Sequence, residues 1–142
     1  MYLEEVKVGD RLQPVERRPS NIQLFRFSAV TWNAHRIHYD RDYAMSEGYP
    51  DILVQSHLHG CFLSETVLNW AGDSGILRRF RWENRHFAVP GDVLTCDGEV
   101  TAIVEGETCG YVDLKLTERN QDGVVCAPGW ATVELPRRNG HT

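Results

Sequence analysis

The sequence has no long apolar run and few cysteines. All of its apolar runs fall short of the roughly 18 residues that a membrane-spanning helix needs, so no membrane contact is expected. Residues 1–6 lack a basic segment followed by an apolar one, and no secretory signal is expected. Most of the cysteines lie in apolar runs, which favours reduced, buried thiols in a cytoplasmic protein. There is no Cys-x-x-Cys pair, so no metal site is predicted among Cys61, Cys96, Cys109 and Cys126.

Basic residues are outnumbered as well. The chain has 15 Lys and Arg against 20 Asp and Glu, a net charge of −5 at pH 7. This balance lacks the basic footprint of a nucleic-acid-binding protein, and no nucleic acid is expected as a partner. The 142 residues, 42% of them apolar, suffice for one domain with its own core but not for two. A single domain over residues 1–142 is therefore predicted.

The first half of the chain has the pattern of helices. The first twenty residues predict an irregular segment or an edge strand, after which Ser20 is suited to cap a helix that runs to about Thr31. Its apolar residues recur at helical spacing: Ile22, Phe25, Ala29 and Trp32. Asp40 is suited to cap a short helix over residues 41–46. A polar loop, residues 33–39, separates the two helices.

A longer helix and several strands follow. Residues 57–71 predict a helix that is apolar around most of its circumference and therefore buried. Strands are predicted over residues 75–87, 93–104, 110–119 and 124–135, with glycine-containing turns between the last three. Pro128-Gly129 indicates a bulge or an edge position in the last strand. The fold class is α+β, a curved antiparallel sheet wrapped around a central buried helix.

The most specific pattern in the chain is the loop between the first two helices. Residues 27–44 read FSAVTWNAHRIHYDRDYA. This stretch resembles the signature of MaoC-like enoyl-CoA hydratases and hydroxyacyl-thioester dehydratases, in which Asp-x-Asn-x-x-His-x-Asp precedes a short helix. Aligned without a gap, the catalytic His of that family falls on His38, its Asp on Asn33 and its Asn on His35. The variant form is similar to the mesaconyl-CoA-hydratase-like and type 2 hydroxyacyl-thioester dehydratase branch.

Two further stretches agree with this resemblance, which covers roughly residues 20–135. Residues 52–58 occupy the place of the segment that opens the family's central helix, and residues 87–92 resemble its Pro-Gly-Asp turn. The resemblance implies a hot-dog fold and a lyase of fatty acid metabolism that adds or removes water at the double bond of an enoyl thioester. It implies an acyl-CoA or acyl-carrier-protein substrate, no cofactor, and a homodimer or a heteromer with another hot-dog chain.

The loop residues suit this chemistry. Hydration requires one group to take a proton from water and another to deliver a proton to the α-carbon. His38 is suited to proton transfer because the pKa of a free histidine lies near neutrality. Asn33 cannot transfer a proton, although its amide can hold water or a carbonyl oxygen. Three alternatives stay open: His38 acts alone with Asn33 orienting the water, His35 supplies the second group, or the site binds without catalysing.

Substrate-binding residues are expected at two places. The thioester carbonyl needs hydrogen-bond donors, which the N-terminus of the 57–71 helix offers at Ser56 and His57. A basic cluster surrounds Trp82 and includes Arg78 and Arg81, which we predict to bind the phosphates of coenzyme A. The alternative for these arginines is a solvated strand face.

Two rival functions stay open. One is a thioesterase on the same fold, for which Gln55 and Glu65 are the candidate residues. The other is a non-catalytic subunit that completes the active site of another hot-dog chain, which the Asn33 position favours. Residues 69–72 and 98–101 also resemble MaoC-like subunits of steroid side-chain degradation.

Overall fold

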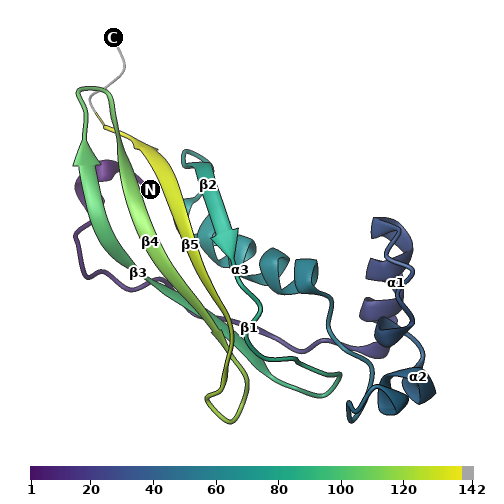
Figure 1. Cartoon of the computed structure of the whole chain (residues 1–142). Helices are drawn as coiled ribbons and strands as arrows, with labels where there is room; N and C mark the ends of the chain where they lie inside the picture. Colours follow the sequence, from purple (N-terminus) through teal and green to yellow (C-terminus); the bar gives the residue numbers. More distant parts are fainter. Residues whose placement is uncertain (139–142) are drawn as a thin grey trace.

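The strands of the second half form one curved antiparallel sheet, and a long helix packs against it (Figure 1). The computed structural model describes residues 1–138. The sheet order is β1-β3-β4-β5-β2, so β1 and β2 are the edge strands. The helices are α1 (Asn21–Thr31), α2 (Arg41–Ser46) and α3 (Ser56–Ala71), with 3-10 turns η1 (Leu3–Glu5) and η2 (Arg36–His38). The strands are β1 (Val15–Arg17), β2 (Ile76–Trp82), β3 (Leu94–Glu105), β4 (Cys109–Arg119) and β5 (Val125–Pro136).

The core lies between α3 and the inner face of the sheet. Alternate residues of β4, such as Leu114 and Leu116, are buried, whereas Asp113 and Lys115 face the other way and are exposed. From α3 the side chains of Leu63 and Val67 are fully buried against them. This arrangement confirms the α+β plan of a sheet around a central buried helix. The prediction of one domain over 1–142 includes residues 139–142, which lie outside the described residues, and it stays a prediction.

The predicted helix starts are confirmed by their caps. The Oγ of Ser20 accepts a hydrogen bond from the N–H of Gln23 at 3.2 Å, and Oδ1 of Asp40 accepts one from Tyr43 at 3.0 Å. Helix α3 begins at Ser56, one residue before the predicted start, and ends at Ala71 as predicted, with Gly72 as its C-cap. The edge-strand option for the first twenty residues is also correct, because β1 pairs with β3.

Three details of the prediction are wrong. The strand predicted over 75–87 ends at Trp82, and the rest of it is a loop. For Pro128-Gly129 the edge option is wrong, because β5 pairs with both β4 and β2, and the irregularity in the register with β4 falls at Cys126. Pro128 lies just past the point where β2 stops pairing. A proline is tolerated there because no neighbouring strand needs its N–H. Cys96 and Cys126 are buried free thiols as predicted, whereas Cys109 is partly buried and Cys61 is exposed.

Helices α1 and α2 lie beyond the N-terminal end of α3, away from the sheet (Figure 1). Leu24 and Ser28 of α1 are buried. The fully buried Gln55, just before α3, donates from Nε2 to the Leu24 carbonyl oxygen at 2.7 Å and to Ser28 Oγ at 2.9 Å. This one side chain therefore ties α1 to the start of α3. No helix within residues 1–138 has the length and apolar content needed to cross a membrane.

The apolar residues that predicted α1 do not face the core. The α1 stripe, defined as Ile22, Phe25, Ala29 and Trp32, is exposed, with Trp32 at 92% and Phe25 at 63%. The helical spacing therefore predicts the element correctly, while a different face of it packs on the chain. An exposed apolar stripe of this kind marks an interaction surface.

Candidate active site

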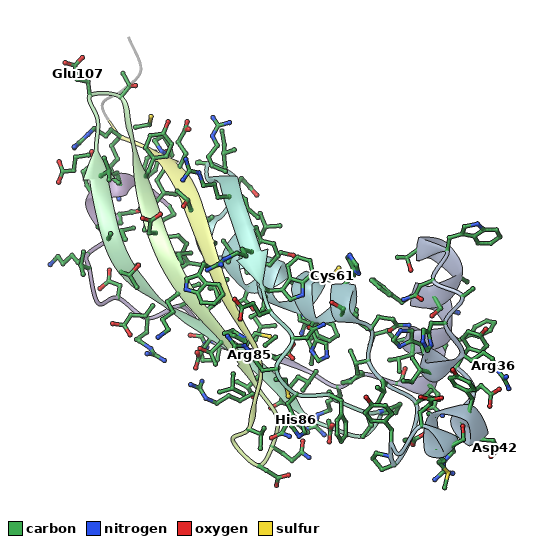
Figure 2. The ribbon with its side chains drawn as sticks, viewed as in Figure 1. Arg36, Asp42, Cys61, Arg85, His86 and Glu107 are labelled. Atoms are coloured by element: carbon green, nitrogen blue, oxygen red, sulfur yellow. The ribbon has the colours of Figure 1, made fainter. Side chains whose placement is uncertain are left out.

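A cavity of about 670 Å³ brings together three separate segments of the chain. The loop after α1 contributes Asn33 and His38, and the start of α3 contributes Ser56 and His57. Four of the seven site residues predicted from the sequence therefore line one cavity. The segment after β2 adds Arg85 and His86, which lie near the end of the sheet (Figure 2).

His38 is held in one orientation by the backbone. Its Nδ1 lies 2.8 Å from the carbonyl oxygen of Leu53. A carbonyl oxygen only accepts, so Nδ1 carries a hydrogen and Nε2 is the basic nitrogen of the neutral ring. Burial lowers the pKa of His38, the hydrogen bond to Leu53 opposes this shift, and the nearby His35 adds to it. The half-buried ring is therefore neutral at pH 7 and can accept a proton at Nε2.

Asn33 follows a left-handed residue at the end of α1. Trp32 has φ 59°, and the N–H of Asn33 bonds the Ser28 carbonyl oxygen at 2.9 Å, which turns the chain out of the helix. The Oδ1 of Asn33 accepts from the N–H of His35 at 3.3 Å. With its oxygen so engaged, the amide nitrogen of Asn33 has no protein partner within residues 1–138. It is available to donate to a water or to a substrate oxygen.

His35 is not among the residues that line the cavity. Its Nδ1 accepts a hydrogen bond from the N–H of Ile37 at 3.2 Å, and its side chain caps η2. The ring is exposed and its centroid lies 5.9 Å from that of His38. The structure therefore places His35 next to His38 but outside the cavity itself.

The N-terminus of α3 presents free backbone donors to the cavity. The N–H groups of Leu58 and His59 both bond the Gln55 carbonyl oxygen, at 3.0 and 3.3 Å. Those of Ser56 and His57 precede the first helical hydrogen bond and have no partner among the described residues, as expected at a helix start. Trp82 Nε1 donates to the Ser56 carbonyl oxygen at 3.1 Å and fixes this end. The two free N–H groups and the helix dipole favour an oxygen with negative charge.

Arg78 and Arg81 lie elsewhere. Both extend from the outer face of the sheet, where Arg78 Nε contacts Glu134 at 2.7 Å and the Arg81 guanidinium stacks on Trp130 at 4.1 Å. The structure therefore brings neither of them to the cavity. Arg85, from the same basic cluster, does line it, with its Nε 2.9 Å from Glu83.

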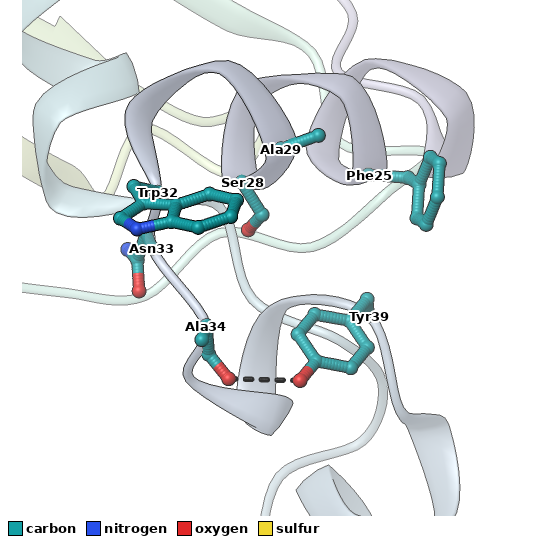
Figure 3. Close-up of a pocket in the computed structure, with 7 residues that line it drawn as sticks. All are labelled: Phe25, Ser28, Ala29, Trp32, Asn33, Ala34 and Tyr39. Atoms are coloured by element: carbon teal, nitrogen blue, oxygen red, sulfur yellow. Dashed lines mark hydrogen bonds between the residues drawn. The ribbon is translucent and has the colours of Figure 1, made fainter.

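A smaller hollow of about 190 Å³ adjoins this site (Figure 3). Phe25, Ala29 and Trp32 of the α1 stripe line it, and the Tyr39 hydroxyl closes one side by donating to the Ala34 carbonyl oxygen at 2.8 Å. Asn33 lines both spaces. An apolar hollow thus begins directly beside the polar site.

The sequence predicted His59 only as a pocket-lining or packing residue, and it gave no indication of its partner Glu118. His59 lines the cavity and pairs through Nδ1 with Glu118, which comes from the middle of the sheet. Their separation of 59 positions left no local signal for this contact.

Within residues 1–138, no three His, Cys, Asp or Glu residues lie together in a group that could hold a metal ion.

Comparisons with known proteins place the chain in a family. Residues 6–90 match the model of hydroxyacyl-thioester dehydratase type 2. Over 43 residues the chain is 60% identical to mesaconyl-C(4)-CoA hydratase of Chloroflexus aurantiacus, a match that spans 30% of this chain and 15% of that protein. It is 32% identical over 106 residues to the 3-oxo-4,17-pregnadiene-20-carboxyl-CoA hydratase beta subunit of Mycobacterium tuberculosis, covering 72% of this chain and 74% of the relative.

Solved structures show the same fold. The MaoC-like dehydratase from Rhodospirillum rubrum superposes with a TM-score of 0.86 at 19% identity, over 97% of this chain and 98% of that one. The predicted hot-dog fold and the predicted resemblance are both confirmed. The chain belongs to the hydroxyacyl-thioester dehydratase type 2 family, on a MaoC-like hot-dog fold.

Proposed function

We propose that this protein is a lyase that adds water to, or removes water from, the acyl group of a coenzyme A thioester at the α,β-position. The family to which it belongs supports this function, as do two relatives named as CoA hydratases. The observation that carries the proposal is that one cavity contains both the basic Nε2 of His38 and the free N–H groups at the start of α3.

The arrangement suggests a sequence of steps. The thioester carbonyl oxygen accepts hydrogen bonds from the N–H groups of Ser56 and His57. Asn33 donates from its amide to a water, and His38 Nε2 takes a proton from that water as its oxygen adds to the β-carbon. Negative charge develops on the carbonyl oxygen at the helix N-terminus, and a second proton-bearing group of the site then gives its proton to the α-carbon. Each step is a proton transfer or the addition of water, so no cofactor is needed for the reaction as proposed.

Arg85 is the best-placed residue for the coenzyme. It lies at the cavity with an exposed guanidinium, a group that binds phosphate in a bidentate manner. Arg78 and Arg81 were predicted for this role, but they lie on the outer face of the sheet and have no contact with the cavity. We therefore propose Arg85 as the phosphate contact of this site.

A second hot-dog chain is proposed as the partner. Strand β2 leaves one edge of the sheet unpaired, which can continue into the sheet of another chain. The exposed α1 stripe gives such a chain an apolar surface to cover. The matched relative from Mycobacterium tuberculosis is a beta subunit, which favours a heteromer, while a homodimer satisfies the same surfaces. A non-catalytic role within such a pair is the second candidate function, because Asn33 stands where proton transfer would otherwise occur.

The thioesterase alternative finds less support. Gln55 is fully buried and bonded to α1, and Glu65 is bonded to Arg17 with Nε 2.9 Å from its carboxylate. Neither of them lines the cavity. Among residues 1–138, no carboxylate lines the cavity where it could activate water against the carbonyl carbon.

The test is an assay of the purified protein with enoyl-CoA substrates, following the loss of absorbance of the conjugated double bond, with His38→Ala as the control. Loss of absorbance that requires His38 supports the proposal. Activity that survives in His38→Ala overturns the assignment of His38. Activity that appears only on mixing with a second MaoC-like chain supports the subunit role, and release of free thiol without loss of the double bond points to a thioesterase.

A further inference from the structure

His59 and Glu118 form a buried pair against the cavity. His59 lies in the first turn of α3 and is 3% exposed, and Glu118 lies in β4 and is 0% exposed. The His59 Nδ1 is hydrogen-bonded to Oε1 of Glu118. A carboxylate accepts this bond, so Nδ1 carries the hydrogen and the other ring nitrogen, Nε2, is the one that can exchange a proton.

The second ring nitrogen of His59, Nε2, keeps a small exposed surface although the residue is nearly buried. It makes no hydrogen bond to any residue within 1–138. In that same part of the chain, Gln55 Oε1 is the single side-chain nitrogen or oxygen that is both enclosed and without a partner. Nε2 is therefore not enclosed, and the space that His59 borders is the cavity it shares with His38 and Asn33.

Glu118 has a second neighbour that does not compete for the proton. The Cys96 Sγ lies 3.7 Å from Oε2 of Glu118. Burial raises the pKa of the Cys96 thiol, and the charge of Glu118 raises it further, so the thiol stays protonated. Among the described residues, His59 is therefore the group through which the charge of Glu118 can influence proton transfer in the cavity. A buried carboxylate is stabilised by a protonated imidazole, because the pair as a whole is neutral.

We propose that His59 is the second proton-transfer group of this site and that Glu118 is the positioning residue that holds it. This inference rests on the hydratase function proposed above. In hydration, the oxygen of water forms a bond to the β-carbon and its proton passes to His38 Nε2. The electron pair of the double bond takes the proton of His59 Nε2 at the α-carbon. His59 ends neutral and His38 protonated, and exchange with solvent restores both.

The alternatives for this role are less well placed. Asn33 cannot transfer a proton, and His35 lies outside the cavity with its Nδ1 bonded to the N–H of Ile37. His38 is already the base of the addition step. His59 meets the remaining requirement of a titratable group in the cavity that is fixed by an opposite charge.

The experiment compares three variants in the hydration assay. His59→Gln is expected to lower kcat by about 100-fold or more, the usual contribution of a general acid or base. Glu118→Gln keeps a hydrogen-bond acceptor for Nδ1 but stabilises an imidazolium less, so the basic limb of its pH–rate profile moves to lower pH. Ser64→Ala is the control, because this hydroxyl lies on the same helix as His59 and donates to the Cys61 carbonyl oxygen within that helix. It should leave kcat and the profile unchanged.

Other titratable groups must be considered in reading that profile. Glu118 contacts His59 from the sheet and is itself contacted by Cys96, and the remaining charged or titratable residues border the same cavity: His38, Tyr49, His57, Arg85 and His86. A shift that appears in Glu118→Gln and not in Ser64→Ala is assigned to the pair, since Ser64 is on the same helix as His59 and bonds only within that helix among the described residues.

A second readout does not depend on turnover. In spectra of ¹⁵N-histidine-labelled wild-type protein, a saturated acyl-CoA is expected to shift the His59 Nε2 resonance, and an unshifted resonance overturns the inference even if His59→Gln fails to fold. Wild-type hydration that His59→Gln retains in full also overturns it while leaving the hydratase function intact. No hydration by the wild type, alone or with a second hot-dog chain, overturns the proposed function and the role of His59 together.

Discussion

The ring of His38 and the backbone of Leu53 are joined by a 2.8 Å hydrogen bond from Nδ1 to the carbonyl oxygen. Any residue at position 53 supplies that oxygen, so the tautomer of His38 depends on the path of the chain between α2 and α3 and not on a side chain. This path is fixed in turn by the N–H of Leu53, which bonds the Ile37 carbonyl oxygen at 2.9 Å. Two backbone bonds thus set which nitrogen of His38 serves as the base.

The pH dependence of hydration follows from His38. Its pKa lies below the ordinary value of 6.5 because burial disfavours the charged ring. The base form is neutral, so the midpoint of the acidic limb of kcat/KM should lie below pH 6.5. A pH–rate profile in buffers of constant ionic strength measures this limb. An acidic limb above pH 7 would contradict the assignment.

Replacement of Asn33 separates water binding from proton transfer. Asn33→Ala removes the amide that we propose holds the water, and kcat should fall by about tenfold, the equivalent of one hydrogen bond. Asn33→Asp keeps an oxygen that accepts the N–H of His35 and should preserve the loop. Steady-state kinetics of both variants provide the measurement. Equal kcat in Asn33→Ala and wild type would show that Asn33 does not touch the reacting water.

Arg85 should affect binding of the coenzyme more than chemistry. Arg85→Ala is expected to raise KM for acyl-CoA by about tenfold with little change in kcat, since a charge-assisted bond to phosphate is lost. The same variant should leave KM unchanged for acyl-pantetheine, which lacks the nucleotide. Arg119→Ala removes an exposed arginine that pairs with Asp97 on the sheet and serves as the control. A rise in KM for Arg78→Ala or Arg81→Ala in place of Arg85→Ala would favour the original prediction.

The α1 stripe is testable through the state of assembly. Trp32→Glu places a charge on a side chain that is 92% exposed in the single chain, so it should not affect folding. If a partner covers this surface, the charge is buried there and the assembly should dissociate. Light scattering after gel filtration measures the mass. Val104→Glu, at an exposed apolar residue of β3, is the matched control, and equal masses for both variants would contradict the proposed interface.

Gly60 supports the start of α3 indirectly. A Cβ at this position would lie 2.7 Å from the ring of Trp82, whose Nε1 bonds the Ser56 carbonyl oxygen. Gly60→Ala should therefore lower the free energy of unfolding by about 1–3 kcal/mol, despite the better helix propensity of alanine. Thermal or urea unfolding gives the value, with Ser64→Ala on the same helix as the control. A more stable Gly60→Ala variant would show that Trp82 moves aside without cost.

Local patterns predicted the elements, and long-range contacts determined the rest. The caps at Ser20 and Asp40 act within three residues, so the sequence alone locates both helix starts. The loop signature likewise predicted that Asn33 and His38 belong together. The pairing of His59 with Glu118 depends on how α3 packs on β4, which no local pattern expresses.

The positions of the arginines also could not be predicted from local patterns. Arg78, Arg81 and Arg85 form one cluster in the sequence, yet β2 ends at Trp82 between them. Strand alternation directs Arg81 to the outer face, and only the loop that follows brings Arg85 to the cavity. Predicting this difference required the exact end of β2, and the strand was expected to continue to residue 87.

Gln55 has a consequence for the energetics of the reaction. By bonding both Leu24 and Ser28, it fixes the segment that carries His38 relative to the N–H groups of α3 before any substrate arrives. The loss of conformational entropy needed to bring acid, base and carbonyl donors together is then met during folding and not during each catalytic cycle. Substrate binding then only has to place one thioester between His38 and the N–H groups of α3, whose separation is fixed in the folded protein.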